Sequence, residues 1–202
     1  DIDALRQGFD DIAVPFAMDW ELFESQRPMR VLLMVSKYDH CLVDLLYRHH
    51  KGELDMQITA IVSNHLDLRP MAEREGIRFI YLPVTKDSKA QQEAALMKIV
   101  DETQTELVVL ARYMQILSDD LCKQLSGRAI NIHHSFLPGF KGAKPYHQAY
   151  ERGVKLIGAT AHFVTSDLDE GPIIEQNVVR VDHTMGVGKL VSKGRGQESE
   201  TL

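Results

Sequence analysis

The chain has 202 residues, 44% of them hydrophobic, which is enough for one domain with a full core. Its 29 acidic and 23 basic side chains give a net charge of -6, and this acidic balance argues against a nucleic-acid substrate. Only two cysteines are present, without a CxxC pair, and no apolar run has the length of a membrane span, so the composition favours a cytoplasmic protein without disulfides or a membrane partner.

The first segment of the chain has apolar residues at helical spacing over residues 2–16, and a polar stretch with a proline follows it. We interpret Ser25–Pro28 as a boundary. A lone helix cannot bury its own apolar face, so residues 1–24 are expected to belong to a unit that packs elsewhere.

From Arg30 onward, short apolar runs alternate with helical patterns, which is typical of a parallel α/β sheet with right-handed crossovers. Residues 156–181 alternate around a D-E-G-P turn, which predicts two strands joined by a functional loop. A long helix ending at Thr103 is expected to have Asp87 as its N-cap. The other strands are expected at residues 30–36, 56–64, 77–84, 106–112 and 128–135, and the other helices at 40–52, 67–76, 118–125 and 145–152.

Three polar loops follow strands of this expected sheet. Ser36–His40 follows the first strand, Ala111–Leu117 follows the fourth, and Asn131–Ser135 ends the fifth. Ligands of open α/β sheets bind beyond the carboxyl ends of the strands. The three loops therefore predict a site at one edge of the sheet.

The stretch NIHHSFLPGF at residues 131–140 places Asn131 and His133 on the same side of a strand, because strand side chains alternate. An amide and a protonated imidazole can both donate hydrogen bonds to an oxygen that becomes negative during acyl transfer. Asp169, in the D-E-G-P turn, is the expected third partner, with its carboxylate positioned by the turn. These three side chains are the candidate catalytic residues.

Other chemistries have weaker support. A serine nucleophile at Ser135 lacks a G-x-S-x-G elbow, and a dinucleotide site lacks G-x-G-x-x-G after the first strand, where SKYDHC stands. No H-E-x-x-H or paired-cysteine spacing supports a metal site, and neighbouring histidines on a strand point to opposite faces. We predict no metal, although four histidines are candidates by type: His133, His134, His147 and His162.

The motifs NIHHSFLPGFKG and HFVTSDLDEGPIIEQ together resemble those of the formyl transferase family that uses 10-formyltetrahydrofolate, and the resemblance extends over roughly Arg30 to Lys193. It implies a Rossmann-like α/β fold with a mostly parallel sheet, flanking helices and a C-terminal antiparallel strand pair. The start of the chain resembles the end of an ACT domain. We therefore expect residues 1–24 to be the C-terminal remnant of an ACT-like domain, 29–193 to be the catalytic domain, and 194–202 to be an atypical polar tail.

The resemblance implies hydrolysis of 10-formyltetrahydrofolate to formate and tetrahydrofolate, which supplies formate for purine synthesis and balances the one-carbon folate pools. The family's catalytic trio falls on Asn131, His133 and Asp169. Folate is implied as the small-molecule substrate, with no cofactor, no nucleic acid and no membrane, in a homo-oligomer. The residues implied to bind folate are Met114, Gln115, Ile116, Leu117, His162, Val164 and Thr165.

Three alternative functions stay open. A glycinamide ribonucleotide transformylase would use the same trio with an amine acceptor, but it needs a glycine-rich phosphate cradle where SKYDH has bulky side chains. A methionyl-tRNA formyltransferase needs a basic surface. A catalytically silent, folate-binding regulator is suggested by the ACT-like start, and the intact trio argues against it.

Overall fold

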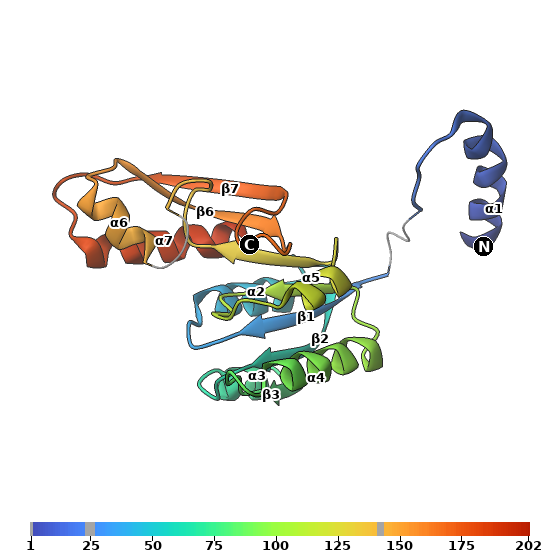
Figure 1. Ribbon diagram of the computed structural model, residues 1–202, viewed down its shortest axis with the longest axis horizontal. Helices are drawn as coiled ribbons and strands as arrows, with labels where there is room; N and C mark the ends of the chain where they lie inside the picture. The colour runs from blue at the N-terminus through green and yellow to red at the C-terminus, as the bar shows by residue number, and fades with distance from the viewer. Residues whose placement is uncertain (1, 23–26, 141–143) are drawn as a thin grey trace.

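The computed structural model describes residues 2–22, 27–140 and 144–202, which contain one seven-stranded sheet with the order β3-β2-β1-β4-β5-β6-β7 (Figure 1). The first five strands pair in parallel, and β6 pairs antiparallel with both β5 and β7. The predicted mostly parallel sheet with a C-terminal antiparallel pair is therefore confirmed. The strands are β1 Met29–Val35, β2 Met56–Ser63, β3 Phe79–Tyr81, β4 Leu107–Leu110, β5 Ala129–His133, β6 Leu156–Phe163 and β7 Ile173–Arg180.

The helices follow the predicted alternation with small shifts at their ends. The N-cap of α4 is Ser88 and not the predicted Asp87. The backbone N–H and the hydroxyl of Thr85 both donate to Ser88 Oγ, at 2.9 and 2.8 Å, so a turn closed by these two residues sets the start of the helix. The helices are α1 Ile2–Ala13, α2 His40–His50, α3 Arg69–Arg74, α4 Lys89–Glu102, α5 Asp119–Gln124, α6 Pro145–Glu151 and α7 Val187–Thr201.

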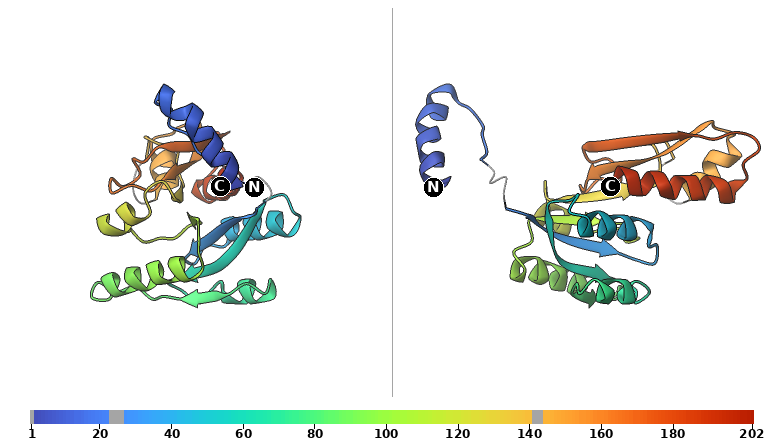
Figure 2. Two further views of the ribbon diagram at one scale, coloured as in Figure 1. Left: turned by 90° about the vertical axis from the view of Figure 1, so that its right-hand side faces the viewer. Right: turned by 180° about the vertical axis from the view of Figure 1, so that it is seen from behind.

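Helices cover both faces of the sheet, which explains why β1 is apolar and buried from Val31 to Val35. Leu33 and Val35 pack with residues of α2 and α3 on one face. Leu32 and Met34 pack with residues of α4 and α5 on the other. Helix α7 lies beside α2 on the first face and also contacts β6 and β7 (Figure 2, right).

Residues 194–202, for which the sequence predicts a polar tail, instead form the second half of α7 and its C-terminal residue. Buried positions in this helix recur every three or four residues, so one narrow face is buried although the composition is polar. Gly194 lies on that face, and a Cβ atom there would be 2.0 Å from Cζ of Tyr146. Glycine therefore allows the Tyr146 ring to lie against the helix backbone.

Helix α1 stands clear of the sheet in Figure 1 and in the right-hand view of Figure 2. The rings of Phe9 and Trp20 meet edge to face with centroids 4.9 Å apart, while Leu5 and Ile12 are exposed. The helical prediction for residues 2–16 is met by α1 and a short 3-10 turn, Val14–Phe16. The ACT-like interpretation stays a prediction, and the predicted boundary at 25–28 lies partly outside the described residues.

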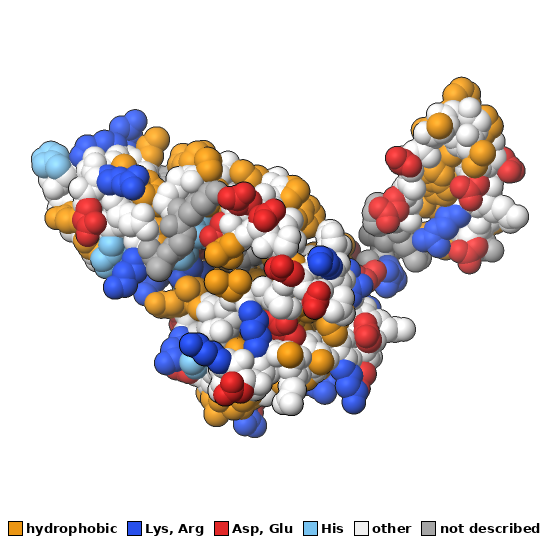
Figure 3. Space-filling view, viewed as in Figure 1, with side chains coloured by type: hydrophobic (Ala, Val, Ile, Leu, Met, Phe, Trp, Pro, Cys, Tyr) orange, Lys and Arg blue, Asp and Glu red, His pale blue; other side chains and the backbone are white. Residues whose placement is uncertain are grey.

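On the face shown in Figure 3, acidic and basic side chains are interspersed over the coloured surface. The coloured side chains form no single basic stripe on that face. Across the described ranges, no helix is both long enough and apolar enough to cross a membrane.

Candidate active site

A crevice forms where the order of the strands reverses. The chain passes from β1 outward to β2 and β3 and then returns to β4, which lies on the other side of β1. At such a switch point, the loops that follow the two neighbouring strands β1 and β4 turn toward opposite faces of the sheet and leave a crevice between them. Open α/β sheets bind their ligands in this crevice. A cavity of about 530 Å³ lies there, lined by Tyr38 and His40 after β1, by the loop after β4 and by the end of β5. The prediction that these three loops converge is confirmed.

All ten residues proposed from the sequence line this one cavity. They come from the β4 loop, the β5 strand and the segment from β6 to the D-E-G-P turn. Their roles stay predictions, but the structure brings them together from separate parts of the chain: Asn131, His133, Asp169, Met114, Gln115, Ile116, Leu117, His162, Val164 and Thr165.

Asp169 and His133 form a buried pair in the cavity wall. Nδ1 of His133 lies 3.3 Å from Oδ1 of Asp169, and only 6% and 7% of the two side chains are exposed. Asp169 has a left-handed backbone with φ of 58°, which Asp tolerates better than most residues. A Cβ atom on Gly171 would lie 1.7 Å from the carbonyl oxygen of Phe163, so the turn approaches β6 closely. These two backbone features direct the Asp169 carboxylate toward β5.

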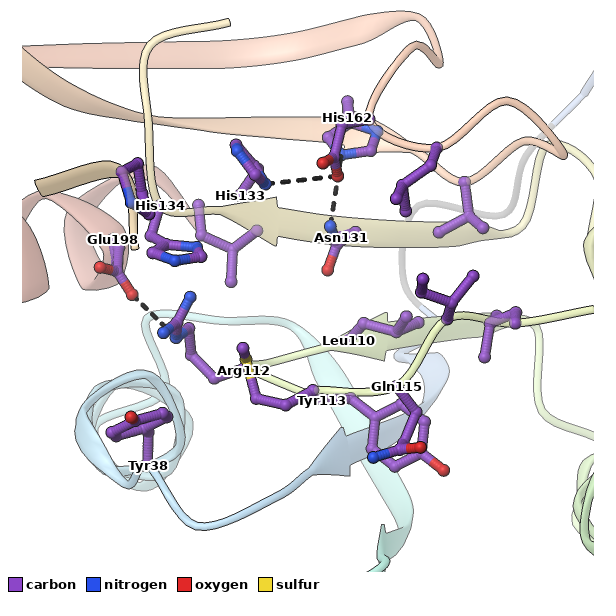
Figure 4. A pocket seen from close by; sticks show the side chains of 18 of the residues that line it. Tyr38, Leu110, Arg112, Tyr113, Gln115, Asn131, His133, His134, His162 and Glu198 are labelled. Carbon is purple, nitrogen blue, oxygen red and sulfur yellow. Dashed lines mark hydrogen bonds and ion pairs between the residues drawn. The ribbon is translucent and has the colours of Figure 1, made fainter. Parts of the chain in front are cut away.

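Asn131 is oriented by His162, which faces it across the antiparallel β5–β6 pair (Figure 4). Nδ1 of His162 lies 2.9 Å from the carbonyl oxygen of Phe163, which can only accept a hydrogen bond. The proton of a neutral His162 ring therefore sits on Nδ1, and Nε2 is left as an acceptor. Nδ2 of Asn131 donates to that Nε2 at 3.3 Å. This bond sets which way the Asn131 amide points.

Electrostatics keep the Asp169 carboxylate charged. Burial raises its pKa, but the hydrogen bond and the charge of His133 are the largest effects in the opposite direction, and the pKa is lowered from 3.8. Nε2 of His133 is buried and has no hydrogen-bond partner among the residues that the structure describes. Of the two ring nitrogens of His133, Nε2 is therefore the one that no described residue engages.

The β4 loop is anchored at its base and exposed at its tip. The backbone N–H of Met114 donates to Ser36 Oγ at 3.0 Å, and the Ser36 hydroxyl donates to Oδ1 of Asn64 at 2.6 Å. Next in the loop, the side chains of Met114 and Ile116 are 47% and 62% exposed and line the cavity. A fixed backbone with exposed apolar side chains can hold a flat heteroaromatic ring.

A second group of polar residues lines the cavity around Glu198 of α7, and it was not predicted from the sequence. Glu198 is 1% exposed. Its carboxylate accepts hydrogen bonds from Nε2 of His40 at 2.8 Å and from the hydroxyl of Tyr146 at 2.6 Å. Nε of Arg112 lies 3.1 Å from Oε2 of Glu198, as an ion pair without hydrogen-bond geometry. The four-residue spacing between Gly194 and Glu198 places both on one helix face, but it does not show that this face is buried.

Burial and ion pairing determine the charge states of Glu198 and of the neighbouring His134. Burial raises the pKa of Glu198, but the His40 hydrogen bond, the Arg112 charge and the Tyr146 hydrogen bond outweigh burial and lower it. Burial, with a smaller effect from Arg112, lowers the pKa of the neighbouring His134 to about 3. Glu198 is therefore charged and His134 is neutral at pH 7.

One cluster in the described part of the chain has the geometry of metal ligands: His40, Cys41 and Glu198, whose ligand atoms lie within 4.8 Å of one another. Burial raises the pKa of Cys41 to about 12, so this side chain is a thiol at pH 7. The positively charged side chain of Arg112 already forms an ion pair with Glu198. The donor set is poorly suited to a cation.

Comparison with known proteins decides the family. Residues 29–202 match the family model described as formyl transferase. A formyltetrahydrofolate deformylase of Corynebacterium sp. (strain P-1) is 57% identical over 201 residues, which are 100% of this chain and 70% of that protein. The chain belongs to the formyl transferase family, among the formyltetrahydrofolate deformylases.

Solved formyl transferase structures have the same fold. The crystal structure of a formyltetrahydrofolate deformylase from Pseudomonas syringae pv. tomato str. DC3000 matches with a TM-score of 0.97 at 51% identity, over 100% of this chain and 67% of that one. A glycinamide ribonucleotide transformylase from Symbiobacterium toebii matches with a TM-score of 0.82 at 29% identity, over 90% of this chain and 87% of that one. The predicted formyl transferase fold is confirmed.

Proposed function

We propose that this protein hydrolyses 10-formyltetrahydrofolate to formate and tetrahydrofolate, and so supplies formate for purine synthesis and balances one-carbon folate pools. The observation that carries the proposal is the buried His133–Asp169 pair beside Asn131, in a chain that belongs to the formyltetrahydrofolate deformylases. A charged carboxylate, an imidazole with a free nitrogen and an oriented amide are the groups that hydrolysis of a formamide needs.

In the proposed mechanism, Asp169 orients a water molecule and takes its proton, directly or through a second water. The water oxygen forms a bond to the formyl carbon. Asn131 and protonated His133 donate hydrogen bonds to the oxygen that becomes negative in the tetrahedral intermediate. The bond from carbon to N10 then breaks, N10 takes the proton that Asp169 removed from the water, and formate and tetrahydrofolate leave. The reacting formyl group belongs to folate, and the steps use that group, water and the three side chains.

We place the pteridine ring against residues 114–117, with Val164 and Thr165 on the opposite side. The ring is flat and has an amide-like edge, which suits main-chain donors and acceptors in an apolar slot. The anchoring of Met114 by Ser36 supports this placement, since a fixed backbone loses little entropy on binding. Direct contact between His162 and folate stays a prediction, beside the contact of His162 with Asn131.

One assay separates the alternatives. Formate and tetrahydrofolate are measured after addition of 10-formyltetrahydrofolate, with and without glycinamide ribonucleotide. Equal release of both products, unchanged by the ribonucleotide, supports a hydrolase. Release of tetrahydrofolate that depends on the ribonucleotide, without formate, would instead identify a transformylase. Folate binding without either product would identify a silent regulator.

A further inference from the structure

The ion pair between Arg112 and Glu198 lies at one end of the cavity, at the base of the β4 loop whose later residues, 114–117, are assigned to folate. Figure 4 shows Arg112 and Glu198 on the His134 side of Asn131, and Gln115 on the other side. The rings of His133 and His134 have centroids 5.2 Å apart, so this end begins next to the candidate catalytic histidine. Both members of the pair line the cavity.

The pair joins parts of the fold that are far apart in sequence. Glu198 on α7 meets His40 at the start of α2, Arg112 after β4 and Tyr146 on α6. Apolar side chains would hold these elements together at least as well, because burying two charges costs several kcal/mol per ion. Arg112 also has a left-handed backbone, with φ of 64°. A costly pair on a strained backbone that lines a cavity indicates a role in that cavity.

Tyr38 extends this wall to the rim of the cavity. The Cζ atoms of Arg112 and Arg195 lie 5.1 and 5.7 Å from the centroid of its ring. Tyr38 belongs to the loop after β1, where a transformylase needs an open cradle for a phosphate group. In this chain that loop carries a bulky ring, and the next helix is tied to α7 through His40 and Glu198.

We propose that the Arg112–Glu198 pair, with Tyr38 against Arg112, closes the acceptor side of the cavity, so that water reaches the formyl carbon and amine acceptors do not. The inference rests on the proposed hydrolysis and assigns these residues to the specificity for the nucleophile. If an amine entered, its nitrogen would form the bond to the formyl carbon, the bond from carbon to N10 would break, and the amine proton would pass to N10.

The test uses glycinamide, a small primary amine, at pH 8 with 10-formyltetrahydrofolate. Arg112→Gly removes the side chain and suits the positive φ, and Glu198→Gln in the same protein avoids an unpaired buried carboxylate. We expect this double variant to make N-formylglycinamide at least about tenfold faster, relative to formate, than the unaltered protein, since even a methylene-sized change in a pocket alters selectivity by about that factor. Arg112→Lys is the matched control, because it keeps the bulk and the charge of the side chain. We expect it to give the same product ratio as the unaltered protein.

The measured quantity is the ratio of N-formylglycinamide to formate, which does not depend on the overall rate. An unchanged ratio in a folded double variant would overturn the proposal, because the pair would then only hold α7 in place. Substantial formylation of glycinamide by the unaltered protein would also overturn it.

If the double variant does not fold, Tyr38→Ala decides, because Tyr38 is 42% exposed and can be removed at little cost to folding. A raised ratio in Tyr38→Ala supports the closed wall, and an unchanged ratio counts against it. A protein that releases no formate in the absence of amine would refute the proposed function itself, and this result is distinct from any change in the ratio.

Discussion

Asn131 and His162 pair across β5 and β6, and the 3.3 Å contact between Asn131 Nδ2 and His162 Nε2 sets the orientation of the amide. A proton on Nδ1 of His162, shared with the Phe163 carbonyl, makes Nε2 the acceptor. We therefore expect His162 to act on the reaction through Asn131, as a positioning residue, beside its predicted contact with folate.

His162→Phe should lower turnover by about 10²-fold with little effect on folate affinity, because a misplaced donor costs most in the transition state. The check is a double-mutant cycle of formate release with Asn131→Ala. If His162 acts through Asn131, its replacement should cost little more once Asn131 is gone. Full additivity of the two losses would show that His162 has a separate role.

Asn131→Ala and His133→Ala should each lower formate release by about 10²–10³-fold while the protein stays folded, because each removes a donor to the developing oxyanion. Steady-state turnover and circular dichroism of both variants provide the check. Turnover close to that of the unaltered protein in either variant would remove that residue from the mechanism.

Asp169→Asn should bind folate nearly as well and turn over far more slowly, since Asn suits the left-handed backbone but cannot take a proton. The pKa of Asp169 is lowered from 3.8, so its charge adds stability above the unfolded pKa, and this is lost as the pH falls through the folded pKa. The variant should therefore lose more stability, relative to the unaltered protein, at pH 7 than at pH 3. Binding and formate assays decide the catalytic role: unchanged turnover would leave Asp169 as a turn residue.

Gly171→Ala should displace the Asp169 turn, because a Cβ atom would lie 1.7 Å from the Phe163 carbonyl oxygen. Turnover should fall by about 10²-fold or more, since the carboxylate would leave its position near His133. Gly196→Ala is the control: Gly196 lies inside α7 with nothing within 4 Å of the added Cβ. The control should keep full turnover and gain up to about 1 kcal/mol of stability from helix propensity. Equal turnover in the two variants would mean that the turn tolerates the methyl group.

His134→Gln should weaken the dependence of stability on pH. Burial lowers the pKa of His134 to about 3, so between that value and its unfolded pKa near 6.5 the unfolded chain binds the extra proton. Stability from this group is complete above pH 6.5 and is lost as the pH falls toward 3. When the pH falls from 7 to 4.5, the low pKa of His134 should lower the free energy of unfolding of the unaltered protein by about 2–3 kcal/mol. The Gln variant should not show this loss. Urea denaturation of both proteins at the two pH values measures the difference, and parallel losses would contradict it.

The sequence by itself determined the sheet and the catalytic candidates. Strand alternation places Asn131 and His133 on one side, and the D-E-G-P turn marks Asp169. Both are local rules, readable within a few residues, and the alternation of strands and helices is a local pattern as well. The edge strand β3 is shorter than expected because it pairs only at Ile61–Ser63 of β2.

Only the tertiary structure revealed the group around Glu198. His40 and Glu198 are 158 positions apart, and no local pattern relates them. Their contact depends on α7 packing beside α2, and the polar composition of α7 hides its narrow buried face. Local periodicity determines which side of a strand or helix a residue occupies, whereas packing between distant elements decides which residues meet across a cavity.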